Sequence, residues 1–190
     1  MALINIFEII GLIAIVFYLG YLFTGLFTPR IKTAYDLIHP KRFNWKDFKF
    51  AVILTAPAIV LHELAHKFVA MAFGYPATFY AFYSNATTLM LAIFSIILKF
   101  FNSPFIFIIP GFVSISPNLT DPIIYRLVAF AGPAANLALW GIAYYIIKNK
   151  KLNRKQLAIW GLTKKLNMFL FIFNMIPLGP LDGAKVFFGP

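Results

Sequence analysis

The sequence predicts an all-α integral membrane protein, a polytopic helix bundle of about four to six transmembrane segments with a short re-entrant β-hairpin-like element. Of its 190 residues, 61% are hydrophobic and only 12% are charged. The mean hydropathy of +0.82 is far above that of a soluble domain. Several apolar stretches also reach the roughly 20 residues that a helix needs to cross a bilayer.

The first two predicted spans lie at about 4–27 and 50–73, on either side of a basic connector at 28–49. No basic segment precedes the first span, so we expect it to stay in the membrane rather than to be a cleaved signal peptide. The second span ends at Gly74 and Pro76. It contains the only dense cluster of polar residues within any predicted span.

Extended segments are expected between the second span and the last ones. Residues 75–84 are aromatic and too short to cross as a helix, so we expect extended chain at the membrane interface. An apolar helix follows at about 87–101. Residues 105–115 then look like two short strands around a Pro-Gly turn. Extended backbone at membrane depth needs protein around it, so we expect a re-entrant hairpin packed on the helices.

Two further helices complete the chain. A span at about 125–147 is followed by a basic segment at 148–155 and by a helix that ends near Met175, before Pro177. The span at 125–147 has a face of small residues suited to close helix packing, formed by Ala131, Gly132, Ala134, Ala135 and Ala138.

The distribution of charge predicts topology and partners. The net charge of +11 is concentrated beside the spans, which is typical of the positive-inside rule and of contact with anionic lipid. We therefore expect the lipid bilayer and not a nucleic acid as partner, with 28–49 and 148–155 both cytoplasmic. An even number of crossings must then separate them, so 87–101 and 104–116 either both cross or both do not. For this multi-pass protein the plasma membrane is the expected location.

The motif His62-Glu63-x-x-His66 lies within the second predicted span. Its spacing puts the two imidazoles on one helix face, about 6 Å apart along the axis, so that both can bind one Zn²⁺ ion. Glu63 lies next to them and can act as the general base on a metal-activated water. Ionisable residues within a span are costly and are rarely kept without a function. The motif therefore predicts a catalytic zinc centre.

A catalytic zinc site generally has three protein ligands, and the third can be sought by elimination. The chain has no cysteine, and its other glutamate, Glu8, precedes the motif. The candidates in the basic connector are His39, Asp36 and Asp47, which are expected to be solvated. Asp121 is expected to cap a helix. Asp182 lies in a segment broken by Pro and Gly at the end of a membrane helix, which can direct a side chain into a cavity, and it is favoured. The candidates set aside are His39, Asp36, Asp47 and Asp121.

Three motifs together resemble the site-2 protease family of intramembrane zinc metalloproteases. The first is His62-Glu63-Leu-Ala-His66. The second is Asn174-x-x-Pro177-x-x-x-x-Asp182-Gly183, and the third is Gly132-Pro133-Ala-Ala-Asn136. The resemblance covers roughly residues 50–185. The helix at 87–101 looks like an insertion relative to the simplest members.

The resemblance implies zinc bound by His62, His66 and Asp182, with Glu63 as the base. It implies that Asn136 and Asn174 orient substrate or stabilise the oxyanion, for which the alternative is hydrogen bonding between helices. It also implies that extended chain beside the metal holds substrate as an added strand, with 77–83 and 105–115 as the candidates.

We therefore expect residues 1–190 to form a single membrane domain, with a first span and connector at 1–49 and a metalloprotease core at 50–185. The expected function is an intramembrane zinc endopeptidase that binds one ion and cuts transmembrane segments of single-span membrane proteins. The alternative is a catalytically silent relative that acts as a binding or chaperone protein, which would not need Glu63. A metal transporter would need polar residues along a path, and other membrane zincins would need a downstream Glu.

Overall fold

The computed structural model describes most of the chain. The described residues are 3–27, 43–101, 103, 111–116 and 119–189. Within them the chain forms six helices and a two-stranded antiparallel sheet. It divides into two compact units, which are described separately. One consists of Met1–Ala56 and Ala81–Gly111, and the other of Pro57–Tyr80 and Phe112–Pro190.

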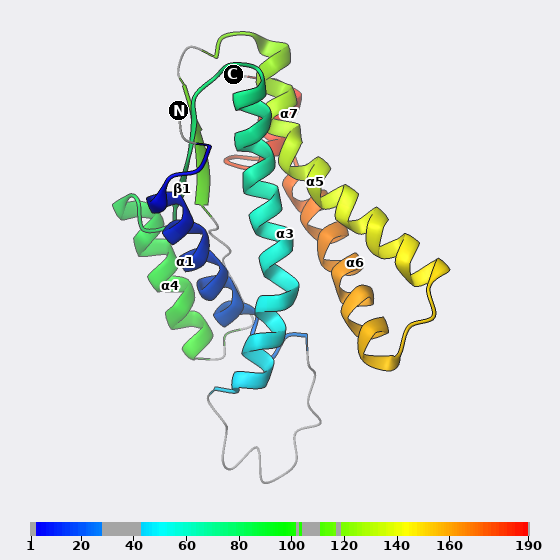
Figure 1. The fold of residues 1–190 in the computed structure, drawn as a ribbon. Coiled ribbons are helices and arrows are strands. Elements are labelled where there is room, and N and C mark those ends of the chain that lie inside the picture. The colour runs from blue at the N-terminus through cyan, green and yellow to red at the C-terminus, as the bar shows by residue number, and fades with distance from the viewer. Residues whose placement is uncertain (1–2, 28–42, 102, 104–110, 117–118, 190) are drawn as a thin grey trace. The chain divides into compact units, whose positions relative to one another are not determined.

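The first unit contains α1 (Ile6–Phe23), the beginning of α3 (Trp45–Ala72) and α4 (Ala86–Phe100). Figure 1 shows α1 and α4 side by side, in blue and green. α1 begins with a capping box, in which Asn5 and Glu8 satisfy each other's backbone N–H groups. At its other end the Lys99 ammonium donates to the Thr24 carbonyl over 2.7 Å. This contact satisfies a carbonyl at the end of α1.

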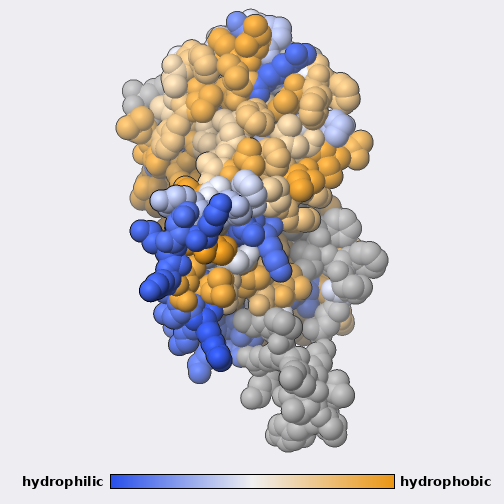
Figure 2. Space-filling view, turned by 90° about the vertical axis from the view of Figure 1, so that its right-hand side faces the viewer, coloured by the Kyte–Doolittle hydropathy of each residue, from blue (hydrophilic) through white to orange (hydrophobic). Residues whose placement is uncertain are grey.

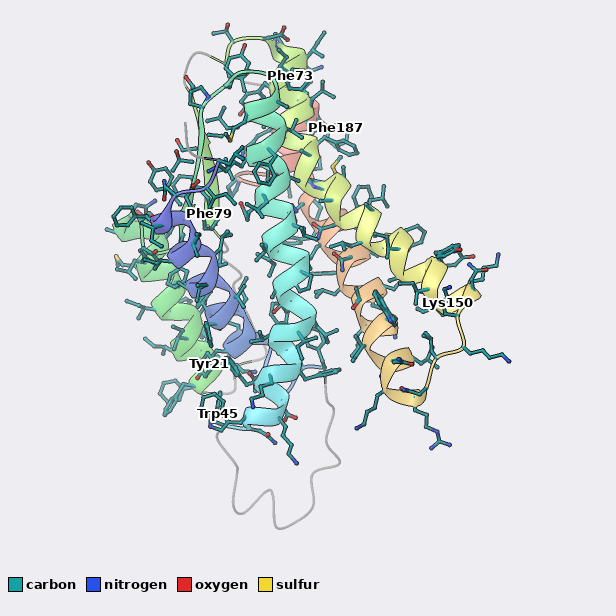
Figure 3. The ribbon with its side chains drawn as sticks, viewed as in Figure 1. Tyr21, Trp45, Phe73, Phe79, Lys150 and Phe187 are labelled. Atoms are coloured by element: carbon teal, nitrogen blue, oxygen red, sulfur yellow. The ribbon has the colours of Figure 1, made fainter. Side chains whose placement is uncertain are left out.

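α3 is a 28-residue helix that contains Pro57 and begins five residues before the predicted start at 50. The Asn44 side chain accepts from the Lys46 backbone N–H over 2.8 Å, which stabilises the earlier start. Trp45 packs edge-on against Phe48, and Figure 3 shows it at the same end of the unit as Tyr21. Aromatic residues of this kind favour the membrane interface. One face of α3 is buried, at Ala51, Leu54, Thr55, Ala58, Ile59, His62, Glu63, His66, Lys67 and Ala70.

The second unit contains the end of α3, α5 (Pro122–Asn149), α6 (Arg154–Asn174) and α7 (Asp182–Phe188). α5 and α6 form an antiparallel pair, in yellow and orange in Figure 1. The prediction that Asp121 caps a helix is confirmed, since its carboxylate accepts from the backbone N–H groups of Ile123 and Ile124. The predicted break between Asn174 and Asp182 is present at 175–181, and the chain becomes helical again at Asp182.

The two strands are β1 (Ala77–Ala81) and β2 (Gly111–Ile115), and they pair with each other. Extended chain was predicted at both places. A hairpin within 105–115 was also predicted, but 104–110 lie outside the described residues, and β2 pairs with β1. The buried core beneath the strands consists of Ala70, Ala77, Leu119 and Val128. The sheet is thereby attached to α3 and α5.

Three helices of the described part, α1, α3 and α5, are long and apolar enough to cross a membrane. α4 is apolar but has only 15 residues. Figure 2 shows hydrophilic residues gathered over the α5–α6 turn, whereas most of the rest of that face is hydrophobic. The turn, marked by Lys150 in Figure 3, is exposed and basic, with Lys148, Lys150, Lys151, Arg154 and Lys155.

Candidate metal centre

The buried face of α3 contains His62, Glu63 and His66. Each of these three residues is at most 8% exposed, although the neighbouring Leu61 on the same helix turn is apolar and exposed. The helical period produces this arrangement, because positions four residues apart share a face. α3 therefore presents its polar residues inward and an apolar surface outward.

Asp182, the first residue of α7, lies next to the two histidines although it is far from them in sequence. Its Oδ2 atom lies 3.2 Å from Nε2 of His62 and 3.2 Å from Nε2 of His66. The two Nε2 atoms are themselves 3.1 Å apart. Three donor atoms from α3 and α7 thus form a nearly equilateral triangle.

The connection between α6 and α7 positions Asp182 beside the two histidines. α6 ends at Asn174, just before Pro177, and Gly179 then takes a positive φ of 50°. Gly183 lies directly on the Met175 backbone, and a Cβ at this position would collide with that backbone and lie 2.7 Å from the Ile176 carbonyl oxygen. The absence of a side chain at 183 therefore allows α7 to pack against the end of α6.

Each imidazole is oriented by a hydrogen bond at its other ring nitrogen. Nδ1 of His62 lies 2.6 Å from Oδ1 of Asn136. Nδ1 of His66 lies 2.7 Å from the Val128 carbonyl oxygen. Both partners on α5 are acceptors, so both Nδ1 atoms donate, and the lone pairs of both Nε2 atoms are left for a metal.

Gly132 on α5 borders the donor triangle. A Cβ at this position would collide with Nε2 of His66 and lie 2.6 Å from Nε2 of His62. Gly132 was expected to allow close packing between helices, and it does so against α3, where its close neighbours are the two imidazoles. Ala138, which was predicted on the same face, is exposed.

The residues fit a zinc ion. Ligand atoms of a tetrahedral zinc with bonds of 2.0–2.1 Å lie about 3.3 Å apart, close to the separations within the triangle. Two neutral imidazoles and one carboxylate are a common donor set for catalytic zinc. Glycine at 132 keeps the space beside the donors open.

The carboxylate of Asp182 is suited to remain ionised. Its second oxygen, Oδ1, lies 3.8 Å from the Lys185 ammonium. Only the ionised form can bind a metal.

Curated relatives of this chain are metalloproteases by name. Three are each called "Putative zinc metalloprotease", from Methanocaldococcus jannaschii, Synechocystis and Bacillus subtilis. The Methanocaldococcus jannaschii protein is 32% identical over 145 residues, which cover 76% of this chain and 72% of the relative. The chain belongs to the site-2 protease family of zinc metalloproteases. The Bacillus protein is 28% identical over 72% of this chain and 67% of its own length.

The match to the Synechocystis protein is 29% identical over 70% of this chain, but it covers only 29% of that longer relative. No protein-family profile matches the chain. No solved structure matches it either.

Among the residues that the site-2 protease resemblance singled out, the structure brings His62, His66, Asp182 and Asn136 together. Asn174 lies at the end of α6, where its amide donates to the Leu170 carbonyl over 3.0 Å. Of the ligand candidates set aside, His39 and Asp36 lie outside the described residues. Asp47 lies in the first turn of α3.

Sequence reasoning missed Asn167. It lies on α6, is 1% exposed and accepts from Nδ2 of Asn136 over 2.9 Å. A signal was present in the sequence, because Asn167 begins the otherwise apolar stretch that ends at Asn174. A polar residue in such a stretch indicates hydrogen bonding between helices.

Proposed function

We propose that this protein is an intramembrane zinc endopeptidase that hydrolyses peptide bonds in transmembrane segments of membrane-protein substrates. The observation that carries the proposal is the convergence of three donor atoms beside the buried Glu63, on the inner face of an apolar helix long enough to cross the bilayer. Kinship with zinc metalloproteases supports the same chemistry.

In this mechanism His62, His66 and Asp182 would hold one zinc ion. When bound, zinc would lower the pKa of the attacking water towards 7 and polarise the scissile carbonyl. The Glu63 carboxylate would accept a proton from the attacking water and later donate it to the leaving amine. Its position supports this role, since it directly follows His62 on the buried face of α3 and is itself 5% exposed.

The β1–β2 sheet is the candidate platform for substrate. A substrate helix hides its peptide carbonyls in internal hydrogen bonds, so it must unwind before attack. An unwound segment can pair with a strand edge, and each strand of a two-stranded sheet has one edge that the other strand does not occupy. Tyr80 and Phe112 stack with ring centroids 5.5 Å apart and are both about two-fifths exposed, which offers an apolar surface beside the strands.

The two asparagines of the family motifs have separate roles in this proposal. Both Nδ2 hydrogens of Asn136 have acceptors, the Ala58 carbonyl and Asn167, so its amide supports the orientation of His62 rather than an oxyanion. Asn174 is half-buried and uses one contact within its own helix, so it is the better candidate to orient substrate.

The substrates we propose are single-span membrane proteins, and the proposed location is the plasma membrane. The alternative function is a catalytically silent membrane relative that acts as a binding or chaperone protein. The burial of Glu63 beside the donor atoms favours the enzyme, because a purely structural metal site needs no general base.

The test compares wild type with Glu63→Gln and His66→Ala in detergent, by zinc content and by cleavage of a single-span substrate. We expect about one zinc in wild type and in Glu63→Gln, and a loss of cleavage of at least about 100-fold in the latter, as expected when a general base is removed. His66→Ala should lose both zinc and cleavage. Cleavage by Glu63→Gln at the wild-type rate would contradict the proposal.

A further inference from the structure

Asn167 is a fully buried amide whose hydrogen bonds lead to the metal centre. Its Nδ2 donates to the Thr163 carbonyl on the same helix over 2.9 Å. Its Oδ1 accepts from Nδ2 of Asn136 on α5 over 2.9 Å. An amide buried to 1% exposure is costly unless it is hydrogen-bonded, and these two bonds account for its burial.

These bonds fix the direction of both amides. Because the Thr163 carbonyl can only accept, it holds the Asn167 nitrogen and directs the Asn167 oxygen to Asn136. The Asn136 nitrogen then has two acceptors, Asn167 and the Ala58 carbonyl, which lies at 2.9 Å. Only the oxygen of Asn136 remains to face His62.

The direction of the Asn136 amide determines the tautomer of His62. Its oxygen lies 2.6 Å from Nδ1 of His62, so this nitrogen must carry the hydrogen. Nε2 of His62 then presents a lone pair to the place where His66 and Asp182 converge. If the Asn136 amide were turned around, its nitrogen would donate to Nδ1 and the lone pair at Nε2 would be lost.

His66 provides an internal comparison. Its Nδ1 faces the Val128 backbone carbonyl, which cannot reverse its polarity. The tautomer of His66 therefore needs no side chain to set it, whereas that of His62 depends on a side-chain amide, which Asn167 and the Ala58 carbonyl together hold in one direction.

We propose that Asn167 is a positioning residue for the zinc ligand His62, acting through Asn136. This inference rests on the proposed function, since it takes His62 as a zinc ligand. Asn167 on α6 fixes the Asn136 amide on α5, and that amide fixes the imidazole on α3. Residues on three helices of the second unit thus determine that Nε2 of His62 keeps its lone pair.

The test measures zinc affinity by competition with a chromophoric chelator in detergent, for wild type and Asn167→Leu. Removal of such an outer hydrogen bond should weaken zinc binding by about 10- to 100-fold. Thr163→Val is the matched control on the same helix, because it keeps the backbone carbonyl that Asn167 uses, and it should bind zinc like wild type. Wild-type affinity in folded Asn167→Leu would overturn the proposal.

A second readout does not depend on zinc or on proteolysis. The chain has three histidines, so ¹⁵N labelling of histidine gives few signals, and metal-free protein reports each tautomer. We expect His62 and His66 both to carry hydrogen at Nδ1 in wild type. In Asn167→Leu only His62 should become mixed. Equal changes at both histidines would indicate general loosening and would overturn the specific role.

A smaller substitution covers the possibility that Asn167→Leu fails to fold. Asn167→Ala removes the acceptor of the Asn136 amide without adding apolar bulk, so it should also weaken zinc binding by about 10- to 100-fold. Wild-type affinity in folded Asn167→Ala would contradict the proposal. If wild type binds no zinc, the proposed function fails, while the histidine tautomers still report on Asn167.

Discussion

At the scale of single residues, Gly132 is important to the site because it leaves space beside the two imidazoles. It has no side chain to bind or react, but a methyl group here would collide with Nε2 of His66 and crowd Nε2 of His62. The Nδ1 atoms on the far side of both rings are held by α5, the helix to which Gly132 belongs. The rings therefore cannot move away easily.

We predict that Gly132→Ala loses most zinc binding, by at least about 10-fold, because the methyl group occupies space between the donor atoms. The measurement is zinc content and affinity of the purified protein. Gly141→Ala on the same helix is the matched control, since a Cβ there meets nothing within 4 Å. It should bind zinc normally and be equally or more stable, by up to about 1 kcal/mol. Wild-type affinity in Gly132→Ala would show that the space is not needed.

At the scale of elements, α7 is the short helix that brings the third donor. It begins at Asp182 itself, so the ligand and the helix are placed together. The close approach of Gly183 to the Met175 backbone fixes where that first turn lies.

We predict that Gly183→Ala weakens zinc binding by about 10-fold or more, because a methyl group against backbone costs about 1–3 kcal/mol or displaces α7. Zinc competition in detergent checks this. Gly161→Ala on α6, where a Cβ meets nothing within 4 Å, should leave the affinity unchanged. If both variants bind zinc like wild type, the contact of α7 with α6 does not control the position of Asp182.

At the scale of the whole molecule, the basic turn between α5 and α6 indicates the orientation in the membrane. α5 has 28 residues and is about 42 Å long, which exceeds the hydrocarbon core of about 30 Å. Its two ends should therefore reach opposite surfaces. The lysines at the C-terminal end of α5 favour the cytoplasm.

The absence of native cysteine allows a direct test of this orientation. We predict that Lys150→Cys reacts with a membrane-impermeant thiol reagent only from the cytoplasmic side. Thr120→Cys, which replaces an exposed residue just before α5, should react only from the other side. Labelling of both positions from one side would show that α5 does not cross.

The pairing of the strands could not be read from the sequence. Extended chain was predicted at 75–84 and 105–115, but no local pattern in either segment shows which strand it pairs with. β2 pairs with β1 across the whole of α4. A contact so distant in sequence depends on the packing of the helices that surround it.

The sequence by itself determined the helices, the membrane character and the residue types of the proposed metal donors. Hydrophobic length and the spacing His62-x-x-x-His66 are local properties, so a sequence pattern can reveal them. It also indicated Asp182 as the third donor, through elimination. Only the tertiary structure decided what surrounds those donors. Asn167, Gly132 and Gly183 matter because of which atoms lie opposite them, and those atoms come from other helices. Hydrogen-bond direction and the space for a missing Cβ are set by packing in three dimensions, which residue spacing does not specify.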